Sequence, residues 1–443
     1  MTVAETRDEA NLHKRQKKER KLNLKKEPAP HQCEFFLKRK NRYCAMRKKT
    51  GHKFCLDHAL FEKVNDECGS EKTDESRVPC PLDPNHTVRQ SDLQSHLKKC
   101  NARPVETHDP WYSKDINKIL LGCETAEIET DKNSTLITET ENETLHRLFS
   151  VLKEYDQKMA PLEKKIYTHA GLDAWFLKKE NKKHVTQQAS LVGAMKETGL
   201  LSGSHFYMEF GCGKAELSRM VNACIVHETK SEKNSKNADL ANYGFGLVDR
   251  GVNRMKMDNK IVSDCDDSVL KPQIKRSRID IQHLSLDKFL KSVHHGPIVA
   301  ISKHLCGAAT DLTLKLILNS VNSKKQLDGL VVAMCCRHCC DYEQLLPQSQ
   351  EYLAKRGIFR KDFACLKKIV TWAVCGRSEN EDNHASGLTY EERERMGLVA
   401  RRLIDESRVE AINALLESHM VELFLYAEKD TTLENHCLRI TRR

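Results

Sequence analysis

The sequence has few aromatic residues and no long apolar run. Only 6% of its 443 residues are Phe, Trp or Tyr, and Trp occurs 3 times. No window approaches the ~18 consecutive apolar residues that a membrane-spanning helix needs, so we expect no membrane protein. The N-terminal segment has no apolar stretch between its charged residues, so we expect no secretory signal peptide either.

Cysteine is abundant, with 18 residues in the chain. Without an export signal, this number does not indicate a disulfide scaffold. In a reducing compartment, which we expect to be the nucleus, the cytoplasm or both, cysteines serve as metal ligands, reactive thiols or small core residues. At ~100–200 residues per domain, the length predicts two to four domains.

The positive charge is concentrated at one end of the chain. Residues 1–60 contain 17 Lys or Arg and 7 Asp or Glu, and their excess equals the net charge of the whole chain, +10. We expect residues 1–30 to be a disordered basic arm. Such a block indicates a polyanionic partner, most often a nucleic acid, with a nuclear-import tract or a solvated tail as the alternatives.

Two segments after the arm have the spacing of zinc ligands. In residues 31–60, three cysteines and His58 are spaced as zinc ligands in a basic sequence that needs something to fix its fold, and His52 competes for the fourth position. In residues 78–102 we expect a helix that places the last two ligands on one face. The predicted ligands are Cys33, Cys44, Cys55 and His58 in the first segment, and Cys80, His86, His96 and Cys100 in the second.

The order of ligands in the second segment resembles the CHHC zinc finger of a minor-spliceosome protein and of certain tRNA methyltransferases. The first segment resembles the Cys3His finger that precedes the CHHC finger in one tRNA methyltransferase family. Both resemblances imply an RNA-binding role.

The rest of the chain divides into a linker with a helical segment, residues 103–160, and a larger domain, residues 161–443. In the larger domain, short apolar runs alternate with helical patterns, which predicts a doubly wound parallel sheet. We expect surface loops near residues 228–242, 256–276 and 378–387. The predicted strands are residues 205–210, 243–249, 278–281, 297–303, 328–335, 421–428 and 436–442.

A glycine-containing turn follows the first predicted strand. Glu209, Gly211 and Gly213 are spaced as acid-x-Gly-x-Gly between a strand and a helix. A dinucleotide places its pyrophosphate at this helix N-terminus, where an acid is unwelcome, whereas S-adenosylmethionine is cationic and has no phosphate. Asp249, which ends the second strand, suits the ribose hydroxyls, and Asp280 suits the adenine edge. These acids favour S-adenosylmethionine over a dinucleotide.

Further polar residues follow the next two strands. Lys303 and His304 end one strand, and residues 335–340 contain four cysteines with Arg337 and His338. The carboxyl edge of an open α/β sheet is where ligands bind. A metal site within residues 335–340 is a weaker alternative to a functional loop, because adjacent side chains point in different directions.

Taken in order, these motifs resemble the eukaryotic tRNA 2′-O-methyltransferases that modify nucleotide 4 of the acceptor stem. The resemblance implies a class I, Rossmann-like α/β methyltransferase with two N-terminal zinc fingers and a seven-stranded sheet whose last strand is antiparallel. It also implies methyl transfer from S-adenosylmethionine to a ribose 2′-hydroxyl of tRNA, with Zn²⁺ in the fingers.

Within that reaction, Lys303 or His304 is our candidate base, and Arg337 or His338 our candidate phosphate contact. One rival hypothesis is an RNA-binding splicing or adaptor protein with an inactive methyltransferase fold. Another is a methyltransferase that acts on protein or on a small metabolite.

Overall fold

The computed structural model forms two units, residues 1–104 and 105–443, which we treat separately. The predicted arm, residues 1–30, lies outside the described part of the chain except for its last three residues. No helix in the described part is both long and apolar enough to cross a bilayer. The structure describes residues 28–37, 42–44, 46–48, 50–55, 77–98, 100, 109–122, 140–178, 182–231, 242–253, 255–374 and 386–443.

The first unit contains two small antiparallel hairpins. β1 (Phe36–Leu37) pairs with β2 (Arg42–Tyr43), and β3 (Arg77–Cys80) pairs with β4 (Asp83–Arg89), which is followed by α2 (Leu93–Leu97). Around the first hairpin, the core that is described comprises three cysteines with Phe35 and Phe54 packed against them. A core this small needs a metal or another cross-link to be stable.

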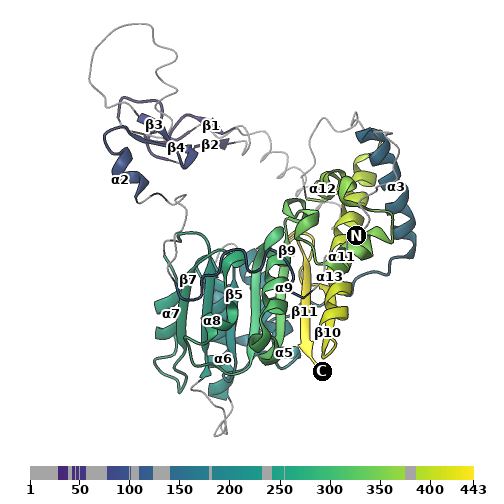
Figure 1. Cartoon of the computed structure of the whole chain (residues 1–443). Helices are drawn as coiled ribbons and strands as arrows, with labels where there is room; N and C mark the ends of the chain where they lie inside the picture. The colour runs from purple at the N-terminus through teal and green to yellow at the C-terminus, as the bar shows by residue number, and fades with distance from the viewer. Residues whose placement is uncertain are drawn as a thin grey trace, which may run out of the picture. The chain divides into compact units, whose positions relative to one another are not determined.

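The second unit is built on one seven-stranded sheet (Figure 1). Its strand order is β10-β11-β9-β8-β5-β6-β7, in which β11 alone runs in the direction opposite to the other six strands. Seven strands with an antiparallel last strand confirm the predicted class I methyltransferase fold. The strands are β5 (Phe206–Phe210), β6 (Gly244–Asp249), β7 (Gln273–Arg278), β8 (Ile298–Cys306), β9 (Leu327–Cys335), β10 (His419–Leu425) and β11 (His436–Arg442).

Helices cover both faces of the sheet because both faces of its strands are apolar, as β5 illustrates. Phe206, Met208 and Phe210 join one core cluster, whereas Tyr207 joins another, because successive side chains of a strand point to opposite faces. All of β5 is therefore apolar except Glu209. The helices of this unit are α3 (Glu141–Lys158), α4 (Asp173–Lys178), α5 (Lys183–Glu197), α6 (Glu216–Ser231), α7 (Asp258–Ser263), α8 (Leu286–Leu290), α9 (Ala308–Asn319), α10 (Val321–Gln326), α11 (Pro347–Ala354), α12 (Phe363–Thr371) and α13 (Tyr390–Leu415).

The predicted boundary at residues 160/161 does not divide the structure. α3 packs with α11, α12 and α13 in a third core cluster, beside the β10–β11 side of the sheet (Figure 1). Trp111, earlier still in the chain, donates a hydrogen bond to Ser277 Oγ over 2.8 Å and stacks edge-on against Phe289. The segment predicted as a linker therefore contributes to the methyltransferase core.

Two other local predictions were wrong. The strand expected at 278–281 lies earlier, at β7, and the loop expected at 256–276 contains α7 and the start of β7. The sequence of β7, QIKRSR, does not alternate between apolar and polar residues because its charged side chains pack locally. Arg276, for example, forms two hydrogen bonds of 2.7 Å with Asp258 at the start of α7.

A buried network of charges ties α13 to the carboxyl end of β9. Arg337 and Asp405 are both fully buried, and the guanidinium donates to the carboxylate over 3.1 Å and 2.7 Å. Arg337 also pairs with Glu434 and donates to the carbonyl of Met334. Burial alone would raise the pKa of Asp405, but the charge of Arg337 and the hydrogen bond from His436 lower it.

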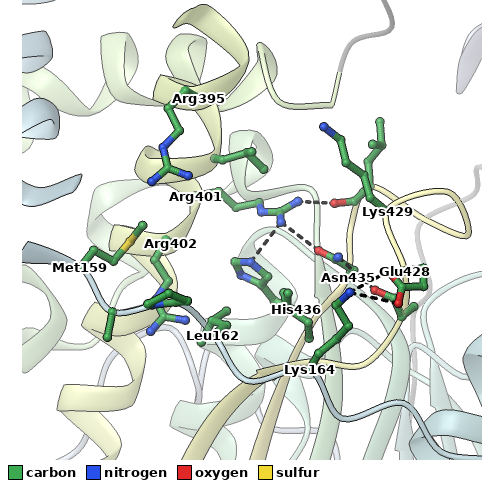
Figure 2. A pocket seen from close by; sticks show the side chains of 16 residues that line it. Met159, Leu162, Lys164, Arg395, Arg401, Arg402, Glu428, Lys429, Asn435 and His436 are labelled. Atoms are coloured by element: carbon green, nitrogen blue, oxygen red, sulfur yellow. Dashed lines mark hydrogen bonds and ion pairs between the residues drawn. The ribbon is translucent and has the colours of Figure 1, made fainter. Parts of the chain in front are cut away.

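His436 extends this network toward Arg401, as Figure 2 shows. Burial, followed by the charge of Arg401, lowers the pKa of His436 to about 3, so the ring is neutral. Its Nδ1–H then donates to Asp405 over 2.6 Å, and its Nε2 accepts from Arg401 over 3.0 Å. In the series Arg401–His436–Asp405–Arg337, each side chain thus forms a hydrogen bond with the next.

We predict that Arg337→Leu lowers the free energy of unfolding by about 3–5 kcal/mol, because it leaves Asp405 buried without its main partner. Denaturant titration measures this change. The pKa of Asp405 is lower in the folded state than in the unfolded state. The ionised carboxylate therefore contributes its full stabilisation above about pH 4, and this contribution is lost as the pH falls and the carboxylate becomes protonated. The variant should therefore lose stability less steeply in acid than the wild type.

Arg360→Leu is the matched control. Arg360 pairs with Glu343 at the surface, with side chains that are 72% and 53% exposed, so its loss should change stability little. Equal destabilisation of the two variants would contradict the importance of the buried network.

Candidate functional site

The predicted site residues come together at the carboxyl edge of the sheet. The chain leaves β5 toward β6 on one side, whereas β8 lies on the other side, so β5 and β8 flank the point where the strand order reverses. Such a reversal is where open α/β sheets bind ligands. The turn after β5 and the end of β8 meet here, since a Cβ added to Gly211 would lie 3.4 Å from the carbonyl oxygen of His304.

The turn after β5 has the backbone of a ligand-binding loop. Gly211 and Gly213 adopt positive φ angles of 64° and 52°, and Ala215, at 65°, shares this conformation. Only glycine enters this region readily. A Cβ added to Gly213 would meet no atom within 4 Å, so the loop borders open space on the side where a cofactor can approach.

Asp249 lies directly against this loop. Its carboxylate accepts hydrogen bonds from the backbone N–H groups of Gly213, over 2.7 Å, and Gly251, over 2.6 Å. Asp280 follows the adjacent strand β7, where it is half-buried and accepts a hydrogen bond from the N–H of Gln282. The two acids thus lie at neighbouring strand ends, with Asp249 against the glycine loop, which fits the hydroxyls and positive charges of S-adenosylmethionine.

Glu209 has a different place from the one that the sequence suggested. It is 3% exposed, and its carboxylate accepts hydrogen bonds from both the N–H and the hydroxyl of Ser218 in α6. Burial raises the pKa of Glu209 to about 7, against the effect of these hydrogen bonds. Its side chain therefore holds the start of α6 under the loop.

A β-bulge presents Lys303 and His304. Ser302 pairs with Val332 and Leu305 pairs with Met334, so two residues of β8 face one residue of β9. Bulges of this kind redirect side chains next to active sites. The bulge gives the two predicted residues their position at the edge of the cofactor loop.

Lys303 has a partner that the sequence did not reveal. Lys303 is 9% exposed, and its Nζ lies 2.6 Å from Nδ1 of His184 in α5. A hydrogen bond between two nitrogens needs one nitrogen with a lone pair as its acceptor, so the two atoms share one proton: either the ammonium of Lys303 donates to Nδ1 of His184, or the Nδ1–H donates to a neutral Lys303 amine. Partial burial, followed by the charge of Lys303, lowers the pKa of His304 to about 4. No motif links residues 184 and 303, which are brought together by the packing of α5 on the sheet.

The structure does not place Arg337 where a phosphate could reach it. Arg337 is 0% exposed and is paired with Asp405 and Glu434, as described above. Its predicted contact with the RNA backbone was therefore wrong. His338 follows it in the short 3-10 helix η6 (Arg337–Cys339), half-buried, with an Nδ1 that has no hydrogen-bond partner in the described part of the chain.

The zinc ligands of the first segment cluster as predicted, as far as the structure describes them. The Sγ atoms of Cys33, Cys44 and Cys55 all lie within 4.8 Å of one another. His52 is described but is not a member of this cluster. His58 lies outside the described residues, so its role as the fourth ligand stays a prediction.

The second segment forms a similar cluster from Cys80, His96 and Cys100. The Sγ atoms of Cys80 and Cys100 lie 3.7 Å apart, close to the ~3.8 Å edge of a tetrahedron with Zn–S bonds of about 2.3 Å. These donors fit Zn²⁺. α2 ends at Leu97, so Cys100 follows the helix and does not share its face. The side chain of His86 lies outside the described residues.

A cavity of about 390 Å³ opens farther along the sheet edge, between α13 and the segment that joins β10 to β11 (Figure 2). Several cations line it, but acids neutralise three of them. Lys164 pairs with Glu428, Arg395 with Asp156, and Lys429 with Glu394. We therefore give this cavity no part in binding a polyanion.

Comparison with known proteins identifies three regions of the chain. The model of methyltransferase TRM13 matches residues 186–441, the U11-48K-like CHHC zinc finger matches residues 77–101, and the CCCH zinc finger in TRM13 protein matches residues 31–59.

Full-length relatives carry the same name, tRNA:m(4)X modification enzyme TRM13. The protein from Scheffersomyces stipitis is 47% identical over 420 residues, which cover 91% of this chain and 98% of the relative. The protein from Debaryomyces hansenii is 47% identical over 448 residues, 96% and 94% of the two chains. The protein from Saccharomyces cerevisiae is 33% identical over 463 residues, 93% and 96% of the two chains.

We predict that Gly213→Ala weakens binding of S-adenosylhomocysteine at least about tenfold, because the new methyl group enters the space that the loop keeps open. Titration calorimetry measures the affinity. Gly357→Ala is the matched control, since Gly357 also has a positive φ, 73°, with nothing within 4 Å of an added Cβ. Both variants should lose about 1–2 kcal/mol of stability from backbone strain. If Gly213→Ala leaves the affinity for S-adenosylhomocysteine unchanged, the cofactor does not bind at this loop.

Proposed function

Because the chain belongs to the TRM13 methyltransferase family, we propose that it transfers a methyl group from S-adenosylmethionine to the ribose 2′-hydroxyl of nucleotide 4 in the acceptor stem of tRNA. The family makes it a tRNA-modifying methyltransferase. The observation that carries the proposal is the close approach of the glycine loop, at Gly211, to the bulge of β8, which contains Lys303.

The chain supplies alignment and one proton acceptor. S-adenosylmethionine supplies the methyl group and the leaving group. Gly211, Gly213 and Asp249 hold the cofactor, and holding two reactants in line can be worth about 7–11 kcal/mol. When the shared proton rests on His184, the neutral amine of Lys303 has one lone pair, and turning this lone pair from His184 to the ribose hydroxyl lets Lys303 accept the hydroxyl proton.

The first 104 residues suit the shape of the substrate. A paired A-form stem displays its 2′-hydroxyls and phosphates across a shallow groove and hides most base edges, so proteins bind it largely by shape and charge. The fingers and the arm hold the whole positive excess of the chain. We assign them affinity for the tRNA backbone, which is largely independent of base sequence. The nucleus or the cytosol would keep their thiols reduced.

One product analysis tests the proposal. Purified protein is incubated with S-adenosylmethionine carrying a labelled methyl group and with total tRNA, and the labelled RNA is then hydrolysed in alkali. A 2′-O-methyl group blocks cleavage at its own nucleotide, so we expect the label in an alkali-resistant dinucleotide that begins with nucleotide 4. Label on a base, or at a different position, would contradict the proposal.

We predict that Lys303→Ala lowers kcat by about 10²- to 10⁴-fold, the usual contribution of a general base. Its affinity for S-adenosylhomocysteine should stay within about twofold of the wild type. Lys303→Arg keeps the positive charge but cannot accept a proton, because arginine stays protonated. Recovery of activity in Lys303→Arg would show that the residue acts by charge alone, whereas a base gives equal losses in both variants and a flatter pH–rate profile.

A further inference from the structure

Three thiols from two neighbouring strands meet at the carboxyl edge of the sheet. Cys306 ends β8, Cys335 ends β9, and Cys336 follows it, and their Sγ atoms all lie within 4.8 Å of one another. Cys306 pairs with Cys335 in the register of the sheet, and their Sγ atoms lie 2.9 Å apart. These residues belong neither to the fingers nor to the cofactor loop.

The cluster has the same compactness as the two fingers. Among the described residues, three groups bring three metal-ligating atoms within 4.8 Å, and the other two groups belong to the segments that match zinc-finger families. Three thiolates are a soft donor set, which favours zinc or copper(I) over magnesium or calcium. Three sulfurs this close together can ligate a single ion once their side chains adjust.

Adjacent side chains usually point in different directions, but the backbone conformation of Cys336 lets its thiol lie beside that of Cys335. Cys336 adopts a left-handed conformation, with φ 49° and ψ 47°, which is uncommon for a residue other than glycine. This turn brings its thiol to the same side as that of Cys335. A non-glycine residue keeps such a conformation where the surroundings fix it.

Those surroundings are visible on both sides of the turn. The N–H of Cys336 donates to Glu434 over 3.0 Å, and the next residue, Arg337, is locked by its buried ion pairs. Gly307, which follows β8, approaches the short helix η6 after this turn closely, since an added Cβ would lie 2.7 Å from the Cβ of Cys339. These contacts fix the backbone around the thiols before any ligand arrives, so only side-chain adjustment is needed.

We propose that Cys306, Cys335 and Cys336 bind one zinc ion within the methyltransferase unit. The ion bridges the carboxyl ends of β8 and β9, where it fixes the turn beside the Lys303 bulge. The fourth position faces solvent, because Cys306 is exposed, and a water molecule completes the tetrahedron. Cys306 and Cys335 must separate by about 0.9 Å to reach the ~3.8 Å edge of that tetrahedron, and the exposed side chain of Cys306 has room for this movement.

Elemental analysis of the full-length protein, purified under reducing conditions, tests the proposal. We expect the wild type to hold one zinc ion more than its two fingers account for. Cys306→Ser and Cys335→Ser should each lose one zinc ion per chain, whereas Cys80→Ser should lose the zinc ion of its finger. Cys365→Ser is the control, because Cys365 lies in α12 outside the cluster, and it should keep the wild-type zinc content.

A second measurement uses only the wild type, so it tests the proposal even if a cysteine variant fails to fold. In the intact wild type, alkylation of Cys306 followed by mass spectrometry should be slow with zinc and at least about tenfold faster after chelation. A wild-type zinc content that Cys306→Ser leaves unchanged would overturn the proposal. So would a disulfide between Cys306 and Cys335 in the reduced preparation, or the visible absorbance of an iron–sulfur cluster. These results do not depend on the site that is methylated in tRNA.

Discussion

The ion pair between Arg337 and Asp405 is the interaction on which the rest of the site depends. It is buried, and it joins the long helix α13 to the turn after β9. A buried charge that loses its partner is costly, so the turn cannot move away from the helix without a large penalty. The positions of Cys336, of His338 and of the strand end beside them follow from this anchor.

The carboxyl edge of the sheet gathers three kinds of chemistry along neighbouring strands. The glycine loop and its acids follow β5, β6 and β7, the Lys303 bulge interrupts β8, and the thiols end β8 and β9. Parallel strands place all their carboxyl ends at one edge, so residues far apart in the chain become neighbours. Glu209 and Arg337 are buried beneath this edge. Their hydrogen bonds, to Ser218 and to Asp405, fix the backbone next to the glycine loop and the turn after β9.

We assign affinity for tRNA to the first unit and the chemistry to the second. The N-terminal unit has cores of cysteine, histidine and a few aromatic residues, which zinc stabilises, and its residues 1–60 carry a net charge equal to that of the whole chain. The second unit buries a large apolar core on both faces of its sheet and holds the cofactor. α3 and Trp111 belong to this second unit, so the part of the chain between the fingers and the family match contributes to the enzyme's core.

The sequence by itself determined the fold class, the seven strands in outline, the glycine loop followed by Asp249, and six of the eight predicted zinc ligands, which the structure brings together, because each depends on local spacing or periodicity. It misplaced β7, because charged side chains such as Arg276, which pairs with Asp258, replace the apolar residues that indicate a strand. Only the tertiary structure showed that His184 lies against Lys303, that Arg337 faces Asp405 and not the RNA, and that Cys306 joins Cys335 and Cys336. The physical reason is the same in each case: strand register and helix packing bring together side chains from distant segments, and no local pattern encodes such a contact.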